Sequence, residues 1–307
     1  MAKLPENNLA AIFKNTVDKY RDKPAVSFKL KDSYEDKTWL ELDYMVTNIA
    51  SFLLSLGIKK GDKIALFSDN RFEWWVADLA ILSIGAINVP IYATNSELEA
   101  QYILKNSESK ACFVGTKEHL DKVLHIKRKL PKLKELIIFN KQSKKIAKTI
   151  SLHEAIEKGK KVVSKYDIIK KIKTIKPSDV ATIIYTSGTT GDPKGVMLTH
   201  DNIITDARSS LKMVEGLLDE NDVFLSFLPL SHAFERTVGE YLSIILGART
   251  AFAKSLETLL ENFQEVRPTI MISVPRIYEK VHSGIQLKVA DSSPIKKAIF
   301  NWAMNVA

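Results

Sequence analysis

Residues 180–195 read VATIIYTSGTTGDPKG, and this stretch decides how the rest of the chain is interpreted. Its first part, VATIIYT, is apolar and rich in β-branched residues, which predicts a buried strand. The part that follows combines glycines and hydroxyl residues with Pro193 and Lys194. Glycines let backbone N–H groups approach an anion closely, and lysine adds a mobile positive charge. We therefore expect a strand–loop–helix unit that binds phosphate, with an ordinary turn as the alternative.

The loop is not a standard P-loop, although it contains similar residue types. The P-loop pattern is G-x-x-x-x-G-K-[ST]. Gly188 and Lys194 have the required separation, but Pro193 replaces the second glycine and Gly195 replaces the hydroxyl residue that binds magnesium. The dinucleotide pattern G-x-G-x-x-G is absent from this loop as well. A standard P-loop NTPase is therefore disfavoured.

The composition is that of a cytoplasmic globular protein. Of the 307 residues, 45% are hydrophobic and 26% are charged, and the length favours two domains or subdomains. The single cysteine, Cys112, excludes an internal disulfide, and its apolar surroundings predict a buried, inert thiol. The N-terminus does not resemble a signal peptide, and the apolar stretch 74–86 is too short to span a bilayer.

The net charge of +9 is concentrated in one segment. Residues 117–176 contain 19 Lys and Arg against 6 Asp and Glu. We interpret this segment mainly as a solvated surface, with peripheral association with an anionic membrane as the alternative. Nucleic acid is not expected as a partner, because the segment has no aromatic–basic interleaving or known binding signature. The oligomeric state is left open.

Helical and strand patterns alternate along most of the chain, which predicts an α/β fold with largely parallel sheets. We divide it into two packed subdomains, residues 1–176 and 177–307. Trp74 and Trp75 are expected in the core. Helices are expected at 8–20, 39–57, 71–84, 96–107, 200–214, 232–245 and 255–266, and strands at 63–68, 86–92, 111–115, 135–140, 180–186, 223–229, 248–253 and 269–273.

Three motifs give the chain a family resemblance. YTSGTTGDPKG (185–195) resembles the signature loop of the adenylate-forming superfamily. LPLSHAFERT (228–237) resembles the next motif of that family, and its SHxFER form is typical of long-chain acyl-CoA synthetases. NRFEWWVADLAILSIGAINVPIYATNS (70–96) and HDNI (200–203) also fit. The resemblance implies the N-terminal domain of such an enzyme, present over essentially the whole chain.

The resemblance also implies a reaction and its participants. A long-chain fatty acid would react with ATP to give acyl-AMP and pyrophosphate, and CoA would then displace AMP. Thr186 matches a position that helps hold Mg²⁺, and Lys194 is a candidate catalytic residue as well as a nucleotide ligand. The positions that match the nucleotide-binding loop are Thr186, Ser187, Gly188, Thr189, Thr190, Gly191 and Lys194.

The second motif contributes further candidates. His232 matches the position that lines the acyl and adenylate pocket, and we predict a catalytic role for it over a structural one. For Phe234, a wall of the acyl tunnel and an ordinary core position are equally open. Glu235 and Arg236 are expected to be structural, either pairing with charges or capping a helix.

Later motifs of the family are missing. There is no Y-G-x-T-E segment for Mg²⁺ and adenine, no T-G-D segment for ribose, and no small C-terminal lid domain. We therefore expect the N-terminal part of a longer ligase, with little activity alone. Two alternatives remain open: a nucleotide- or acyl-binding module without catalysis, and acyl adenylation with a carrier protein in place of CoA.

Overall fold

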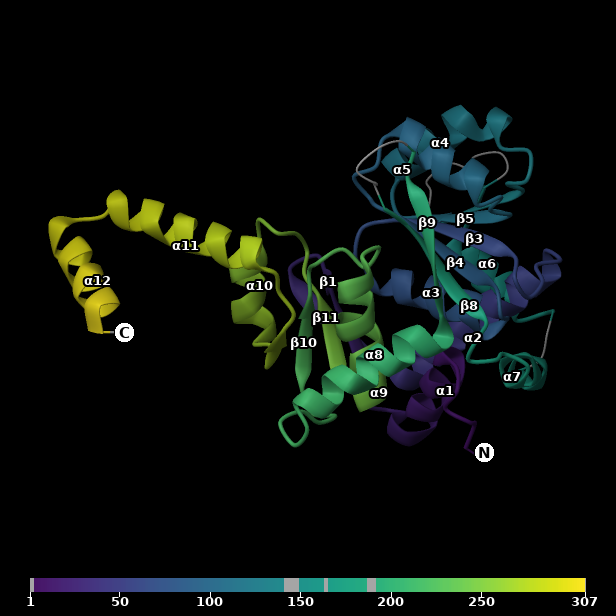
Figure 1. Ribbon diagram of the computed structural model, residues 1–307, viewed down its shortest axis with the longest axis horizontal. Coiled ribbons are helices and arrows are strands. Elements are labelled where there is room, and N and C mark those ends of the chain that lie inside the picture. Colours follow the sequence, from purple (N-terminus) through teal and green to yellow (C-terminus); the bar gives the residue numbers. More distant parts are fainter. Residues whose placement is uncertain (1–2, 141–148, 163–164, 187–191, 307) are drawn as a thin grey trace. The chain divides into compact units, whose positions relative to one another are not determined.

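The computed structural model describes residues 3–140, 149–162, 165–186 and 192–306 (Figure 1). The chain forms two units, Met1–Ile270 and Met271–Ala307. Both sheets of the fold and the pocket described below belong to the first unit, apart from one residue of the last strand.

The larger sheet has seven strands in the order β7-β6-β5-β3-β4-β8-β9. All neighbouring strands are parallel except β8 and β9, which are antiparallel. Apolar residues fill the central strands because helices cover both faces of a parallel sheet. The strands are β3 (Lys63–Phe67), β4 (Ile87–Ile91), β5 (Ala111–Val114), β6 (Glu135–Ile138), β7 (Thr149–Ser151), β8 (Val180–Thr186) and β9 (Lys194–Thr199).

The smaller sheet has five strands in the order β12-β10-β11-β1-β2. β1 is parallel to β11 and forms an antiparallel hairpin with β2. The sequence patterns did not predict this hairpin, whose second strand, SYEDKT, has no buried position. The strands are β1 (Pro24–Leu30), β2 (Ser33–Thr38), β10 (Val223–Ser226), β11 (Arg249–Phe252) and β12 (Ile270–Met271).

Helices supply the rest of the core. One hydrophobic cluster contains residues of both sheets together with Trp39, Trp74 and Trp75, which are completely buried as expected for the pair on α3. The helices of the first unit are α1 (Leu9–Tyr20), α2 (Trp39–Ser55), α3 (Phe72–Ser83), α4 (Glu97–Asn106), α5 (Lys117–Ile126), η1 (Lys127–Lys129), α6 (Leu152–Gly159), α7 (Lys165–Lys173), α8 (His200–Met213), η2 (Glu235–Tyr241), α9 (Leu242–Leu246) and α10 (Leu259–Val266).

Local sequence signals set several helix starts. Ser96 and Glu99 form the predicted capping box, in which the serine hydroxyl accepts from the Glu99 N–H and the glutamate accepts from the Ser96 N–H. Thr38 and Ser151 open α2 and α6 in the same way. These helices therefore begin within one residue of a cap that can be identified in the sequence.

Three expectations need correction. The loop after β8 is followed by strand β9 and not by the expected helix. The two ends of the loop are therefore held by the antiparallel β8–β9 pair and not by a helix N-terminus. The boundary at residue 176 does not separate the sheets, because β8 joins β4 and β1 joins β11. The helix expected at 232–245 is a π-helix, η2, followed by one short α-helix.

The second unit consists of α11 (Pro275–Ala290) and α12 (Pro294–Val306). α11 begins with a proline, whose missing N–H costs nothing in the first turn of a helix. Several large apolar side chains of the two helices are exposed, including Trp302 and Ile295. Within the described residues, no helix combines the length and hydrophobicity needed to cross a membrane.

Candidate active site

A pocket of about 420 Å³ lies where strands of both sheets end. Its walls are the segments that directly follow β3, β4, β10 and β11. Ligands in open α/β sheets bind outside the carboxyl ends of the strands, so its position favours a binding site. The lining residues are Ser68, Asp69, Asn70, Tyr92, Ala93, Thr94, Phe227, Pro229, Ser231, Ala253, Lys254, Ser255, Leu256 and Glu257.

Asn70 joins two of these walls. Its side-chain amide donates to the Leu228 carbonyl (2.5 Å) and to the Ser226 hydroxyl (3.1 Å), and its oxygen accepts from the Leu230 N–H (2.9 Å). Asn70 follows β3 of the larger sheet, whereas the other residues follow or end β10 of the smaller one. One side chain therefore connects the two sheets at the pocket.

Helix α5 holds the wall that follows β4. The His119 ring contacts the Ala93 carbonyl through Nε2 (3.1 Å) and the Thr116 hydroxyl through Nδ1 (3.1 Å). Nearby, Lys122 donates to the Asn95 carbonyl (3.3 Å). Burial lowers the pKa of His119, so its ring is neutral near pH 7 and suited to donating from Nε2.

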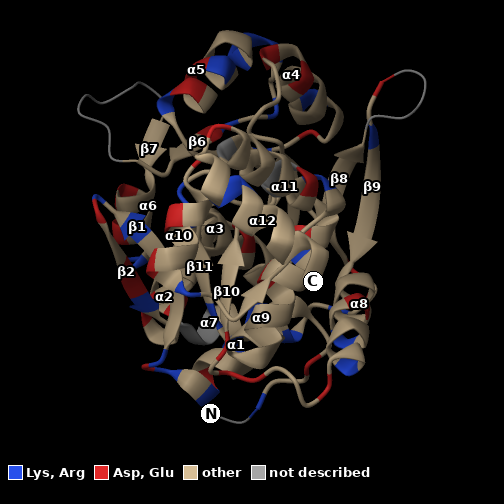
Figure 2. Ribbon diagram, turned by 90° about the vertical axis from the view of Figure 1, so that its left-hand side faces the viewer, with Lys and Arg blue, Asp and Glu red and all other residues tan. Residues whose placement is uncertain are grey.

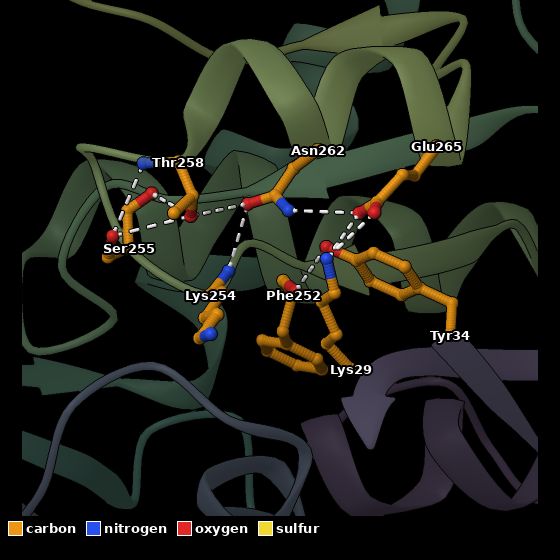
Figure 3. A network of polar contacts seen from close by, with 8 residues as sticks. All are labelled: Lys29, Tyr34, Phe252, Lys254, Ser255, Thr258, Asn262 and Glu265. Atoms are coloured by element: carbon orange, nitrogen blue, oxygen red, sulfur yellow. Dashed lines mark hydrogen bonds and ion pairs between the residues drawn. The ribbon is translucent and has the colours of Figure 1, made fainter. Parts of the chain in front are cut away.

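The wall that follows β11 rests on a polar network, shown in Figure 3. The side-chain oxygen of fully buried Asn262, on α10, accepts from the Lys254 N–H (3.1 Å) and the Thr258 hydroxyl (3.2 Å). The Asn262 amide donates to Glu265 (3.3 Å), which also binds the Lys29 ammonium (2.7 Å). Strand β1 and helix α10 thereby hold the loop that lines the pocket.

Thr186 and Lys194 end and begin the two strands that flank the glycine-rich loop. They are paired in the β8–β9 register, and both are exposed. Because β8 is parallel to β4, Thr186 lies at the same edge of the sheet as the pocket walls. The other predicted loop residues, Ser187, Gly188, Thr189, Thr190 and Gly191, lie outside the described residues.

His232 and Phe234 lie immediately after the pocket residue Ser231. Both are exposed, and Phe234 is 43% exposed, so it is not a core residue. The His232 N–H donates to the Pro229 carbonyl (2.9 Å), and its Nδ1 accepts from the Phe234 N–H (3.3 Å). The imidazole is thus oriented by its own loop next to the pocket.

Glu235 and Arg236 are buried, as expected for structural residues. Glu235 accepts from the Ser226 hydroxyl (2.6 Å), and Arg236 forms an ion pair with Asp78 on α3. Burial raises the pKa of Glu235 to about 8. Cys112 is also fully buried, and burial raises the pKa of its thiol, in agreement with an inert residue.

Sequence reasoning missed most of the pocket. Asn70 and the segment 92–94 fall inside the motif 70–96, yet no role followed from their residue types. His119 binds a backbone group 26 residues away and Asn262 one eight residues away, and no local pattern indicated either contact. The sequence could have indicated the pocket residues only by their position, because each pocket segment directly follows an apolar strand.

The described residues contain no group of three or more His, Cys, Asp or Glu side chains arranged for a metal ion. Thr186 supplies one hydroxyl oxygen at an exposed position at the edge of the sheet. Mg²⁺ in nucleotide sites is held by substrate phosphates, water and one or two protein oxygens. A single hydroxyl beside a loop that is predicted to bind phosphate therefore fits the ion as one ligand among several.

The chain belongs to the AMP-binding enzyme family, whose model matches residues 13–301. This confirms the resemblance inferred from the loop and the SHxFER motif. Long-chain-fatty-acid–CoA ligase ACSBG1 of Rattus norvegicus is 34% identical over 302 residues, which cover 96% of this chain and 42% of that protein. The ligase FadD15 of Mycobacterium bovis is 31% identical over 274 residues, 89% of this chain and 44% of that protein. The chain thus spans less than half the length of these curated relatives.

Solved structures share the fold. A long-chain-fatty-acid–CoA ligase (FadD1) from Archaeoglobus fulgidus has a TM-score of 0.77 at 24% identity, covering 92% of this chain and 55% of that one. The A domain of a carboxylic acid reductase from Segniliparus rugosus, solved with AMP and a co-purified carboxylic acid, has a TM-score of 0.79 at 22% identity and covers 97% and 54%. The α/β architecture is therefore that of adenylate-forming enzymes.

Proposed function

We propose that this chain is part of a ligase that activates a long-chain fatty acid with ATP. The observation that carries the proposal is its similarity to long-chain-fatty-acid–CoA ligases over 96% of its length. The pocket at the carboxyl ends of the strands, with Thr186 at the same edge, supports it. A carboxylate oxygen would attack the α-phosphorus of ATP, the bond to the β-phosphate would break, and pyrophosphate would leave.

The loop between β8 and β9 is proposed to stabilise the departing pyrophosphate. Donors that are fixed before the reaction stabilise charge that develops in the transition state. The six loop positions from Ser187 to Gly191 and Lys194 would bind the phosphates, and Lys194 would add a positive charge. Thr186 would contribute one oxygen to Mg²⁺, which neutralises phosphate charge when it is bound.

The second half-reaction is proposed to transfer the acyl group to CoA. The thiol sulfur would attack the acyl carbon, and AMP would leave with the oxygen of the mixed anhydride. His232 lies beside the pocket and is the candidate residue for contacting the reacting carboxyl group. A carrier-protein thiol is the alternative acceptor, and dependence of product formation on CoA separates the two.

Fatty-acid-dependent exchange of labelled pyrophosphate into ATP tests the first half-reaction. We expect no exchange from the 307-residue chain and exchange from a longer chain that extends to the length of the relatives. In the longer chain, Lys194→Ala should lower exchange by about 10²–10³-fold, the usual cost of losing one transition-state donor. Lys212→Ala, which removes an exposed charge on α8, is the control and should leave exchange unchanged.

A binding module without catalysis is the second candidate, favoured by the 42% coverage of the relatives. It predicts binding of ATP or palmitate by both lengths of chain and exchange by neither. Exchange by the 307-residue chain itself would contradict both this candidate and the proposed need for further residues.

We also propose that the lysine-rich segment contacts anionic membranes. On α5 its lysines already pair with acids, as in Lys117–Asp121 (2.5 Å) and Lys122–Glu118 (2.9 Å), and Figure 2 shows both signs of charge there. Attraction should therefore be weak and sensitive to salt. Sedimentation with phosphatidylserine vesicles at low and high salt tests this, with phosphatidylcholine vesicles as the control. Absence of low-salt binding would contradict it.

A further inference from the structure

Asp78 is a completely buried carboxylate in the middle of α3, an otherwise largely apolar helix. Three side chains from other elements converge on it. Arg236 and Asn88 donate to Oδ1, and the Tyr241 hydroxyl donates to Oδ2. A buried charge is retained only where it is paired and hydrogen-bonded, and Asp78 has both.

Arg236 is buried as completely as its partner. Its Nη1 donates to the Thr182 hydroxyl on β8 (2.6 Å), and its Nη2 also donates to the Tyr241 hydroxyl (3.1 Å). The guanidinium carbon lies 5.2 Å from the centre of the Trp74 ring. The residues Asp78, Arg236 and Tyr241, which we call the Asp78 clamp, therefore join α3, the larger sheet and η2.

The π-helical form of η2 makes the clamp geometrically feasible. Arg236 and Tyr241 are five positions apart. In an α-helix with 3.6 residues per turn, that separation turns the two side chains about 140° away from each other. The i→i+5 repeat of a π-helix instead places them on neighbouring turns of one face, and π-helical segments frequently occur at functional sites. Both oxygens of one carboxylate can then be bound from a single helix.

The clamp is connected to the pocket through the backbone and through Glu235. The Arg236 N–H donates to the His232 carbonyl (3.2 Å), so the same residue binds Asp78 and the candidate catalytic loop. Glu235, the first residue of η2, accepts from Ser226, whose hydroxyl also accepts from Asn70 in the pocket wall.

We infer that Asp78 is a positioning residue: by fixing η2 through Arg236 and Tyr241, it holds His232 and the segment 229–232 against the pocket. The function of that segment rests on the proposed acyl activation, but the positioning itself does not. Asp78 is completely buried and does not line the pocket, so it acts on the pocket through the residues that bind it, and Arg236 and Tyr241 of η2 connect it to the segment 229–232.

The test separates positioning from stability by removing both charges together. Replacing a buried ion pair by apolar residues of similar volume is often neutral or stabilising. We therefore expect Asp78→Leu/Arg236→Met in the 307-residue chain to unfold cooperatively, with a melting temperature lowered only by the loss of the acceptor for Asn88 and Tyr241. The His232 imidazole resonance in a ¹³C-histidine spectrum should shift or broaden, and palmitate affinity, measured by titration calorimetry, should fall by about tenfold or more.

A matched control comes from the buried Lys14–Asp43 pair, which joins α1 to α2. Lys14→Met/Asp43→Leu should leave the His232 resonance and palmitate affinity unchanged. If the Asp78 double variant folds and retains both parental values, the inference is overturned. If it does not fold, the variant Tyr241→Phe tests the positioning role, because it removes only the hydroxyl that donates to Asp78. A shifted His232 resonance in this variant would support the Asp78 clamp. An unchanged resonance would overturn it. If the parent itself does not bind palmitate, the proposed fatty-acid function fails, while the His232 resonance still decides the positioning role.

Discussion

At the scale of single residues, the buried acids around η2 set the local charge balance. Glu235 and Glu240 are almost completely buried, and within the described residues neither oxygen of Glu240 has a hydrogen-bond partner. Burial raises the pKa of both carboxyls, and for Glu240 the nearby Asp78 charge adds to this. Burial thus favours the neutral form of both acids beside the ion pair of Asp78 and Arg236.

Glu235→Gln should make the free energy of unfolding fall less steeply as the pH rises. The pKa of Glu235 is about 8 when folded and about 4.3 when unfolded, so unfolding releases a proton between these values. The free energy of unfolding of the parent then falls by up to about 1.4 kcal/mol per pH unit relative to the variant. Urea unfolding at pH 5 and pH 7.5 measures the difference. A constant difference would show that Glu235 is ionised in the fold.

His200 should make the free energy of unfolding fall as the pH is lowered, the opposite of the effect of Glu235. It is buried at the start of α8, its Nδ1 accepts from the Leu9 N–H (3.3 Å), and burial lowers its pKa to about 4. Unfolding therefore takes up a proton below about pH 6.5, and stability is lost as the pH falls towards 4. His200→Gln keeps an acceptor and should lose less stability between pH 7 and pH 4.5 in the same assay. His125→Gln, at an exposed position, should behave like the parent.

At the scale of elements, close helix packing depends on a glycine at the end of α6. A Cβ atom added to Gly159 would lie 1.8 Å from the backbone oxygen of Asn48 in α2. The two helices approach each other closely because this side chain is missing. The obstructing atom belongs to the backbone of a long helix and cannot rotate away.

Gly159→Ala should therefore lower the free energy of unfolding by about 1–3 kcal/mol, the usual cost of overpacking. Gly284→Ala in α11 is the control, because its added Cβ would meet no atom within 4 Å. Relief of glycine's backbone entropy should make that change neutral or slightly stabilising. Equal melting temperatures for Gly159→Ala and the parent would show that α2 and α6 separate readily.

At the scale of the whole molecule, both sheets combine distant parts of the chain. β8 lies between β4 and β9, and β1 lies between β11 and β2. A chain that ends at residue 176 would lack β8 beside β4 and β11 beside β1, and would leave one edge of each of these two strands unpaired. Bringing such distant strands together costs chain entropy, and only pairing with the partner strand offsets that cost.

Residues 1–176 alone should consequently show no cooperative thermal transition in near-UV circular dichroism. A chain ending at residue 270 retains the first unit and should keep a cooperative transition. Cooperative unfolding of residues 1–176 would support the domain boundary at residue 176 that we predicted from the sequence. It would contradict the expectation that each sheet needs strands from both sides of that boundary.

The sequence by itself determined the local elements and the family. Apolar runs located most strands to within a few residues, the Ser96–Glu99 pair located the start of α4, and the loop 185–195 with SHxFER identified an AMP-binding enzyme. These signals succeed because helix caps, strand periodicity and turn chemistry depend on residues that are close in the chain.

Only the tertiary structure decided how these elements meet. The π-helix and the pocket depend on pairs such as Asp78 with Arg236 and Asn70 with Leu230, which are about 160 residues apart. No local pattern encodes such a pair, because its energy exists only after the sheets have brought the partners together. The sequence therefore identified the family, whereas the fold assembled the pocket and the side chains that hold it.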